Sequence, residues 1–188
     1  PLQLANEETA SGSHRMLELR EVEQQFVFNR IEHKPVLSLL RHFSAPVKIE
    51  QQRSIEELAF LLAHDPDPFN RWDAGQMLSI KIILALVDQV QAGQALSLDE
   101  RFVEAVRSTL QNDALDPALT AQAITLPSES YLADQCDVVD VDAIHTAREF
   151  VRRTLGEQLY DVFKALYRQH DSDQPYCFDA VDMGKRTL

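Results

Sequence analysis

The spacing of the apolar residues changes once along this 188-residue chain, at Ser54. Up to residue 52, apolar and polar side chains alternate over short stretches, and alternation is typical of strands. After Ser54, apolar side chains recur every three to four residues, as they do on one face of a helix. We therefore expect a mainly α protein with a small antiparallel β part, divided into residues 1–52 and 53–188.

The alternating stretches before Ser54 are short and predict antiparallel strands. In Phe26-Val27-Phe28, the two phenylalanines lie on one face of a strand and the valine on the other. The stretches that predict strands are Leu2–Leu4, Met16–Arg20, Gln24–Ile31, Val36–Phe43 and Val47–Gln51. About five such strands are too few for a complete sandwich. We expect a partial β-sandwich whose strand edges are free to pair with another copy of the chain.

Strong helix start signals follow. Ser54-Ile55-Glu56-Glu57 is a capping box, in which the serine hydroxyl accepts an amide and Glu57 reaches back to the cap. A second such box, Ser97-Leu98-Asp99-Glu100, begins at Ser97. Between them, Asp67 and Pro68 open a long helix that Gly93 ends. Further helices are predicted to begin at Asp116, Ser128, Asp140 and Asp179.

Two of the predicted helices are long. The helix from Pro68 to about Ala92 is apolar nearly all round in its middle, as a helix buried on most sides is. The helix capped by Asp140 carries an apolar stripe of Ile144, Ala147, Val151, Leu155, Leu159, Val162 and Leu166. Helix pairs joined by short turns predict a superhelical array. Because no repeat consensus recurs at a fixed period, we expect an irregular α-helical superhelical array.

The chain is acidic, with 30 Asp and Glu against 18 Lys and Arg and a formal net charge of -12. Nucleic-acid binders carry a basic surface, and anionic membranes repel acidic proteins, so we predict neither partner. Solubility explains the acidity most simply, and attraction of a cationic ligand is the alternative. Cys136 and Cys177 fit no disulfide or metal-ligand pattern. Two reduced thiols without a visible signal peptide predict a cytoplasmic protein.

The sequence contains no recognisable catalytic motif. A zinc peptidase would have His-Glu-x-x-His on a helix, which places two imidazoles on one face. None of the six histidines has a histidine four residues away: His14, His33, His42, His64, His145 and His170. A serine nucleophile elbow, a P-loop and a dinucleotide fingerprint are missing as well. We therefore predict no catalytic, no cofactor-binding and no metal-binding residue in this chain.

Three weaker alternatives stay open. Four closely spaced aspartates suggest a calcium loop, although the central glycine and the bidentate glutamate are missing and helix capping explains part of the pattern. These aspartates are Asp134, Asp137, Asp140 and Asp142. Cys136 or Cys177 beside a histidine would make a thiol catalyst. Phe69 and Trp72, one helical turn apart, belong either to the core or to an aromatic patch that binds a peptide.

Seven short segments of the sequence point to a known family when they are taken together. They are Gln25-Phe26-Val27-Phe28, Phe43-Ser44-Ala45-Pro46-Val47-Lys48, Arg71-Trp72-Asp73-Ala74, Gly93-Gln94-Ala95-Leu96-Ser97-Leu98, Asp116-Pro117-Ala118-Leu119, Thr125-Leu126-Pro127-Ser128 and Lys185-Arg186-Thr187-Leu188. No single segment is specific, whereas their order and spacing resemble the bacterial aminopeptidase N family from end to end of the chain.

The resemblance implies a zinc-dependent enzyme with a β-domain, a thermolysin-like catalytic domain, a small β-sandwich and a helical domain that caps the active site. This chain resembles the later part of the sandwich joined to the first helices of the cap, in agreement with the change at Ser54. The family's zinc ligands and general base, and the Gly-x-Met-Glu-Asn motif that grips the substrate amino terminus, belong to the catalytic domain. Neither that motif nor the zinc motif occurs here.

The resemblance therefore implies a non-catalytic, active-site-capping segment of an enzyme that releases N-terminal residues from peptides. We expect it to be inactive by itself and to bind no zinc. Its partners are the catalytic domain of the same polypeptide and, through that domain, peptide substrates. The strand-like start and the helical end, Pro1 and Leu188, predict a piece of something longer. The alternatives are an independent helical scaffold that binds a peptide or protein, and an autonomous hydrolase, which the missing motifs disfavour.

Overall fold

The computed structural model describes residues 1–10, 12–171, 175 and 177–188. Within it the chain forms two compact units, Pro1–Leu37 and Ser38–Leu188. Residues 38–52 therefore fall in the unit that contains the helices. The contacts of residues 38–43 with that unit are described with the candidate site below.

Among its described residues, the first unit contains an isolated antiparallel bridge between Leu4 and Phe28 and no strand. Next to the bridge, the amide of Asn29 donates to the carbonyl of Gln3 at 2.8 Å. The small β part of the predicted fold is therefore not confirmed. Apolar side chains such as Val22 stay exposed, and a few extended residues without a packed face do not make an independently stable sheet.

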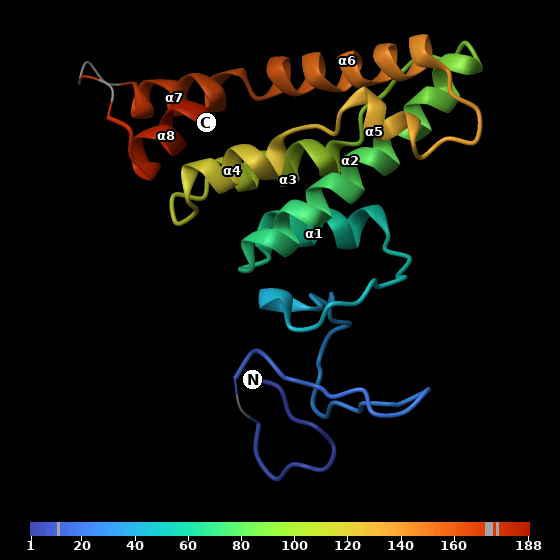
Figure 1. Ribbon diagram of the computed structural model, residues 1–188, viewed down its shortest axis with the longest axis vertical. Helices are drawn as coiled ribbons and strands as arrows, with labels where there is room; N and C mark the ends of the chain where they lie inside the picture. The colour runs from blue at the N-terminus through green and yellow to red at the C-terminus, as the bar shows by residue number, and fades with distance from the viewer. Residues whose placement is uncertain (11, 172–174, 176) are drawn as a thin grey trace. The chain divides into compact units, whose positions relative to one another are not determined.

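Helices make up the regular structure of the second unit, so the prediction of a mainly α protein is confirmed. In chain order they are the short 3-10 helix η1 (Arg41–Phe43), α1 (Ile55–His64), α2 (Pro68–Gln91), α3 (Glu100–Leu110), α4 (Pro117–Ile124), α5 (Glu129–Ala133), α6 (Val141–Gln158), α7 (Tyr160–His170) and α8 (Ala180–Thr187) (Figure 1). None of the described helices is both long enough and apolar enough to span a membrane.

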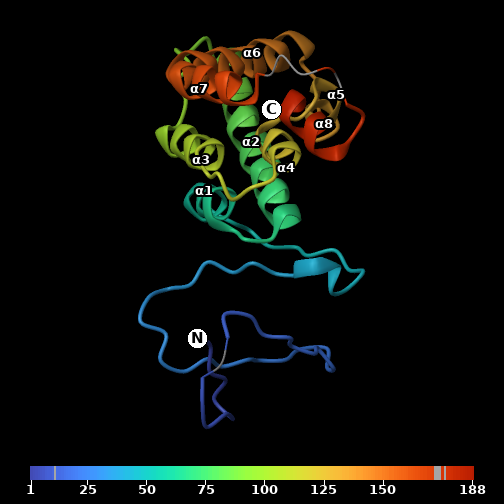
Figure 2. The same cartoon turned by 90° about the vertical axis from the view of Figure 1, so that its left-hand side faces the viewer.

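Helix α2 is the central element of this unit, because α1, α4 and α6 all pack against it (Figure 2). Its buried apolar residues are Ala74, Leu78, Ile82, Ile83, Leu86 and Val87. The approach of α4 is close: a Cβ atom on Gly75 would lie 2.7 Å from the carbonyl oxygen of Ala123. Past the end of α2, Gly93 has a φ of +64°, a left-handed conformation that glycine adopts without steric cost.

The predicted capping box at Ser97 is wrong. Helix α3 begins at Glu100, and the side chain of Asp99 accepts a hydrogen bond from the Arg101 amide at 2.9 Å. Aspartate and serine are about equally good N-caps, so local preference does not choose between the two positions. Arg101 Nε also donates to Asp99 Oδ1 at 2.9 Å, and this additional bond favours the start at Asp99.

The long helix predicted after Asp140 is interrupted. Helix α6 ends at Gln158, Leu159 leaves helical geometry with φ -109° and ψ 14°, and α7 begins at Tyr160. Gly156 lies within the last turn of α6, and glycine is a poor helix former. The apolar stripe continues through the bend, since Leu159 is completely buried.

Candidate functional site

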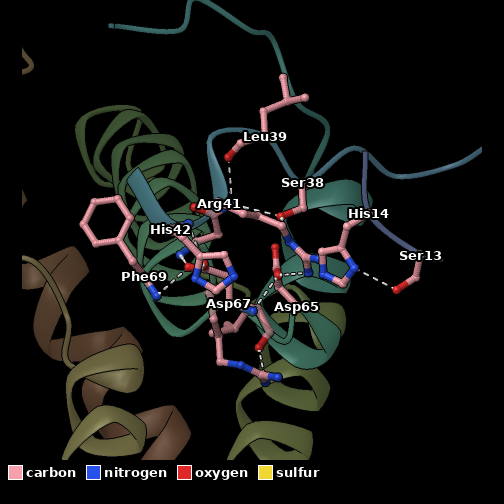
Figure 3. A network of polar contacts seen from close by, with 12 residues as sticks. Ser13, His14, Ser38, Leu39, Arg41, His42, Asp65, Asp67 and Phe69 are labelled. Atoms are coloured by element: carbon pink, nitrogen blue, oxygen red, sulfur yellow. Dashed lines mark hydrogen bonds and ion pairs between the residues drawn. The ribbon is translucent and has the colours of Figure 1, made fainter. Parts of the chain in front are cut away.

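A cluster of charged side chains lies at the turn between α1 and α2, where Asp65-Pro66-Asp67-Pro68 separates the two helices (Figure 3). The side chain of Asp65 is fully buried and pairs with Arg41. Its Oδ1 atom accepts hydrogen bonds from Arg41 Nη2 at 2.8 Å and from the Asp67 amide at 2.9 Å. A buried carboxylate is tolerated only when it is paired in this way, so Asp65 ties the turn to residues 24 positions earlier.

Asp67 is the N-cap of α2 and also contacts the same earlier segment. Its Oδ1 accepts the amides of Phe69 and Asn70 at 3.1 and 3.0 Å. Its Oδ2 accepts the His42 amide at 3.0 Å and lies 3.6 Å from His42 Nδ1. Burial would raise the pKa of Asp67, but the amides of Asn70, His42 and Phe69 and the His42 charge together lower it.

Arg71 closes the other side of the turn. Its Nη1 donates to the carbonyl oxygens of Leu62 and Ala63, both at 2.8 Å. These carbonyls belong to the last turn of α1, where carbonyl groups have no hydrogen-bond donor within the helix and positive charge is favourable. Burial lowers the pKa of Arg71, and the Asp65 charge opposes that change. Arg71 therefore acts as a side-chain cap for α1.

Residues Ser38–Phe43, called the strap below, lie against this turn. Asn70 Nδ2 donates to Ser38 Oγ at 2.9 Å and to the Leu39 carbonyl at 2.8 Å. Together with the contacts of Arg41 and His42, these hydrogen bonds hold the strap to α2 and to the residues just before it. They explain why residues 38–43 group with the helices rather than with the strand-like segment.

The strap ends at a row of three aromatic rings. The ring of Phe43 lies 4.6 Å from that of Phe69, which lies 5.5 Å from the ring of Trp72. Phe69 is 43% exposed and Phe43 is 71% exposed. The sequence left open whether Phe69 and Trp72 are core or surface, and Phe69 lies on the surface. The sequence offered one signal for this cluster, the alternation of two aspartates with two prolines in Asp65-Pro66-Asp67-Pro68, of which we interpreted Asp67 and Pro68 only as the start of a helix.

The other candidate residues do not assemble a site with the strap. Asp140 caps α6 by accepting the Ala143 amide at 3.0 Å, and it also accepts from Gln91 at 3.2 Å. The Ala143 amide, followed by Gln91, lowers the pKa of Asp140. Among the residues that the structure describes, no three His, Cys, Asp or Glu side chains form a group that could hold a metal ion. The described residues therefore do not fit a zinc site, which needs three or four such ligands.

The two cysteines lie in unlike surroundings. Cys136 is half-buried, and its Sγ donates to the Leu132 carbonyl at 3.5 Å. Cys177 is exposed, and its hydrogen bond to Asp179 together with the nearby negative charge raises its pKa. A reactive thiol needs a lowered pKa, so the surroundings of Cys177 do not favour thiolate chemistry.

A surface pocket of about 570 Å³ lies between the ends of α1 and α3. Its lining is mostly polar and includes His64, Glu104, Arg107, Gln111 and Asp113. Arg107 Nε already donates to Glu104 at 3.0 Å. Small-molecule sites are mostly apolar, so this pocket does not have the character of a substrate site.

Both parts of the chain match known protein families. The family described as "Domain of unknown function (DUF3458_C) ARM repeats" matches residues 55–188, and the one described as "Domain of unknown function (DUF3458) Ig-like fold" matches residues 1–52. Aminopeptidase N of Escherichia coli is 40% identical over 173 residues, which are 92% of this chain and 20% of that protein. Aminopeptidase N of Caulobacter vibrioides is 35% identical over 86% of this chain and 18% of that protein.

A solved structure agrees with these relatives. The crystal structure of Legionella pneumophila aminopeptidase A in complex with aspartic acid matches with a TM-score of 0.70 and 28% identity. The match covers 89% of this chain and 20% of that one. The chain thus spans about a fifth of the length of the relatives that it matches.

Proposed function

Because this chain belongs to the DUF3458_C family and is homologous to bacterial aminopeptidase N over most of its length, we propose that it is a non-catalytic segment of a zinc-dependent aminopeptidase. The observation that carries the proposal is the 40% identity over 92% of the chain. The parent enzyme releases N-terminal residues from peptides. This segment has a structural role there and helps to cap the active site.

The proposed domain division is 1–52, the C-terminal part of a β-sandwich, and 53–188, the first part of a helical capping domain. The two family matches end and begin at residues 52 and 55, which supports this division. Stacked helical repeats present extended concave surfaces. Such a surface is suited to walling a chamber over a catalytic domain of the same polypeptide.

In this proposal the zinc of the parent is held by residues outside this chain, and no residue here takes part in catalysis. The proposed partners are the catalytic domain and, through it, peptide substrates, in the bacterial cytoplasm. The contribution of this segment is to exclude water and folded proteins from the chamber. Excluding water strengthens the electrostatic interactions around a metal-bound substrate.

The experiment is an assay of the purified chain with an alanyl chromogenic anilide, with and without added zinc, alongside a measurement of bound zinc. We expect neither turnover nor stoichiometric zinc. Full-length Escherichia coli aminopeptidase N, assayed in parallel, verifies the substrate and the conditions. Zinc-dependent turnover that survives removal of host peptidases would contradict the proposal, because an active site would then lie within this chain.

An independent peptide-binding scaffold is the second candidate, and the exposed aromatic row of Phe43 and Phe69 is the observation that favours it. Trp72 is the sole tryptophan of the sequence, so its fluorescence reports on this row. A scaffold predicts a saturable change in Trp72 fluorescence when short peptides are added to the isolated chain. A non-catalytic segment whose substrates reach it only through the catalytic domain predicts no such change.

A further inference from the structure

The strap, Ser38–Phe43, has a strained backbone. Leu40, His42 and Phe43 have φ angles of 54°, 55° and 54°. None is a glycine, and the left-handed region is costly for bulky side chains. Residues held in such conformations persist only where surrounding contacts impose them.

Those contacts are three separate tethers between the strap and the α1–α2 region. Arg41 pairs with the buried Asp65, the His42 amide donates to Asp67, and Asn70 donates to Ser38 and Leu39. The tethers are polar, and the side chain of His42 is itself 82% exposed. The closed position of the strap therefore depends on a few directional bonds that oppose backbone strain, rather than on a large buried area.

The aromatic row connects the strap to the surface of α2. Phe43 brings its ring onto Phe69, and Phe69 in turn contacts Trp72. Phe43 is already 71% exposed, so little of its own surface changes exposure when the strap is released. Release does uncover the face of Phe69, which lies at the start of α2.

We propose that the strap is a two-state clasp: strained when closed on the α1–α2 turn, and relaxed when open, with the Phe69 ring uncovered. In the closed state Arg41, His42 and Ser38 are tethered as seen here. In the open state Leu40, His42 and Phe43 return to the common backbone regions. The clasp thereby controls how firmly residues 38–43 are attached to the α1–α2 turn.

The test uses the full 188-residue chain and its single tryptophan. Arg41→Gln removes the ion pair to Asp65. We expect stronger quenching of Trp72 fluorescence by acrylamide, because Phe69, the ring beside Trp72, loses its contact with Phe43. We also expect about tenfold faster chymotryptic cleavage after Phe43, because local opening limits cleavage and breaking a buried pair favours opening. The matched control is Arg152→Gln, which breaks the exposed pair between Arg152 and Glu149 on α6.

Two outcomes would overturn the clasp. One is an Arg41→Gln chain with wild-type quenching and cleavage; the other is an equal increase in Arg152→Gln. Helix content is checked by circular dichroism. If Arg41→Gln loses helix content, Asn70→Ala decides in its place, because it removes the hydrogen bonds to Ser38 and Leu39 without leaving a buried charge unpaired.

Strain is tested separately with His42→Gly. Glycine adopts a φ of 55° without steric cost, so we expect the closed state to be favoured and Trp72 to be less accessible to acrylamide. Ser44→Gly is the matched control, because Ser44 already has an ordinary φ of -62° and glycine there only loosens the chain. More accessible Trp72 in His42→Gly would show that the closed strap is not strained.

Discussion

The two compact units of this chain differ in how their apolar residues are used. In Pro1–Leu37, side chains such as Met16 and Val22 are almost fully exposed, whereas in Ser38–Leu188 residues such as Leu78 and Ile83 are completely buried. Helices make their hydrogen bonds within one segment and need neighbours only for packing. Strands need neighbours even for their backbone bonds. Strand-forming sequence therefore depends far more on the rest of a protein than helix-forming sequence does.

The largest expected difference between the units is in side-chain truncation. Leu78→Ala creates a cavity in the middle of α2 and should lower the free energy of unfolding by about 2–5 kcal/mol. Met16→Ala, at an exposed position of the first unit, should change it by less than about 0.5 kcal/mol. Urea unfolding followed by circular dichroism measures both. Equal losses would mean that the first unit has a core of its own.

A pair of glycines sharpens the comparison within the helices. At Gly75, a Cβ atom would meet the Ala123 carbonyl at 2.7 Å, while at Gly156 it would meet nothing within 4 Å. Gly75→Ala should therefore cost about 1–3 kcal/mol through overpacking. Gly156→Ala should stabilise the chain by roughly 0.5–1 kcal/mol, because alanine is the better helix former. Thermal unfolding of the two variants should shift in opposite directions, and a stabilised Gly75→Ala would show that α2 and α4 are not in close contact.

Helix caps provide the next test. Ser54→Ala removes the hydrogen bond to the Glu57 amide and Asp99→Ala removes the one to the Arg101 amide, so each should cost about 1 kcal/mol. Ser97→Ala should cost almost nothing, since Ser97 lies before the start of α3. Chemical denaturation separates the three variants. A loss in Ser97→Ala as large as that in Asp99→Ala would restore the sequence-based boundary.

The smallest expected effect concerns pH. The lowered pKa of Asp67 means that the charged form of this side chain is more favourable in the folded chain than in the unfolded chain. Its contribution to stability is therefore present above the ordinary carboxyl pKa of about 4 and is lost as the pH falls through the lower, folded value. Asp67→Asn keeps an N-cap acceptor but removes the charge. We expect a shallower loss of stability on acidification, and a parallel acid limb would contradict this.

The helix starts were predictable where one local signal dominates. Ser54, Asp67, Asp116, Ser128, Asp140 and Asp179 all cap helices as expected. The start of α3 was not predictable, because Ser97 and Asp99 are equally suitable caps by local preference, and the additional bond from the Arg101 side chain favours Asp99. The bend at Leu159 was missed for a similar reason: the apolar stripe continues through it, so the spacing carries no sign of the break.

The charged cluster was beyond reach of local patterns. Asp65 and Asp67 stand out as a turn because they alternate with Pro66 and Pro68, but Arg41 lies 24 residues away from its partner Asp65. Spacing along a chain predicts neighbours on one helix or strand, and it says nothing about which distant side chain enters a turn. Likewise, no pattern marks Phe43 as the ring that covers Phe69.

By itself, the sequence determined where six of the helices begin, the family to which the chain belongs and the acidic character of its surface. These depend on neighbouring residues or on residue identities, which are present in the linear order. Tertiary structure alone decided that residues 38–43 group with the helices, that Asp65 is buried and paired, and that Phe69 faces outward. Each of these is settled by contacts between distant segments, whose energies exist only when the chain is folded.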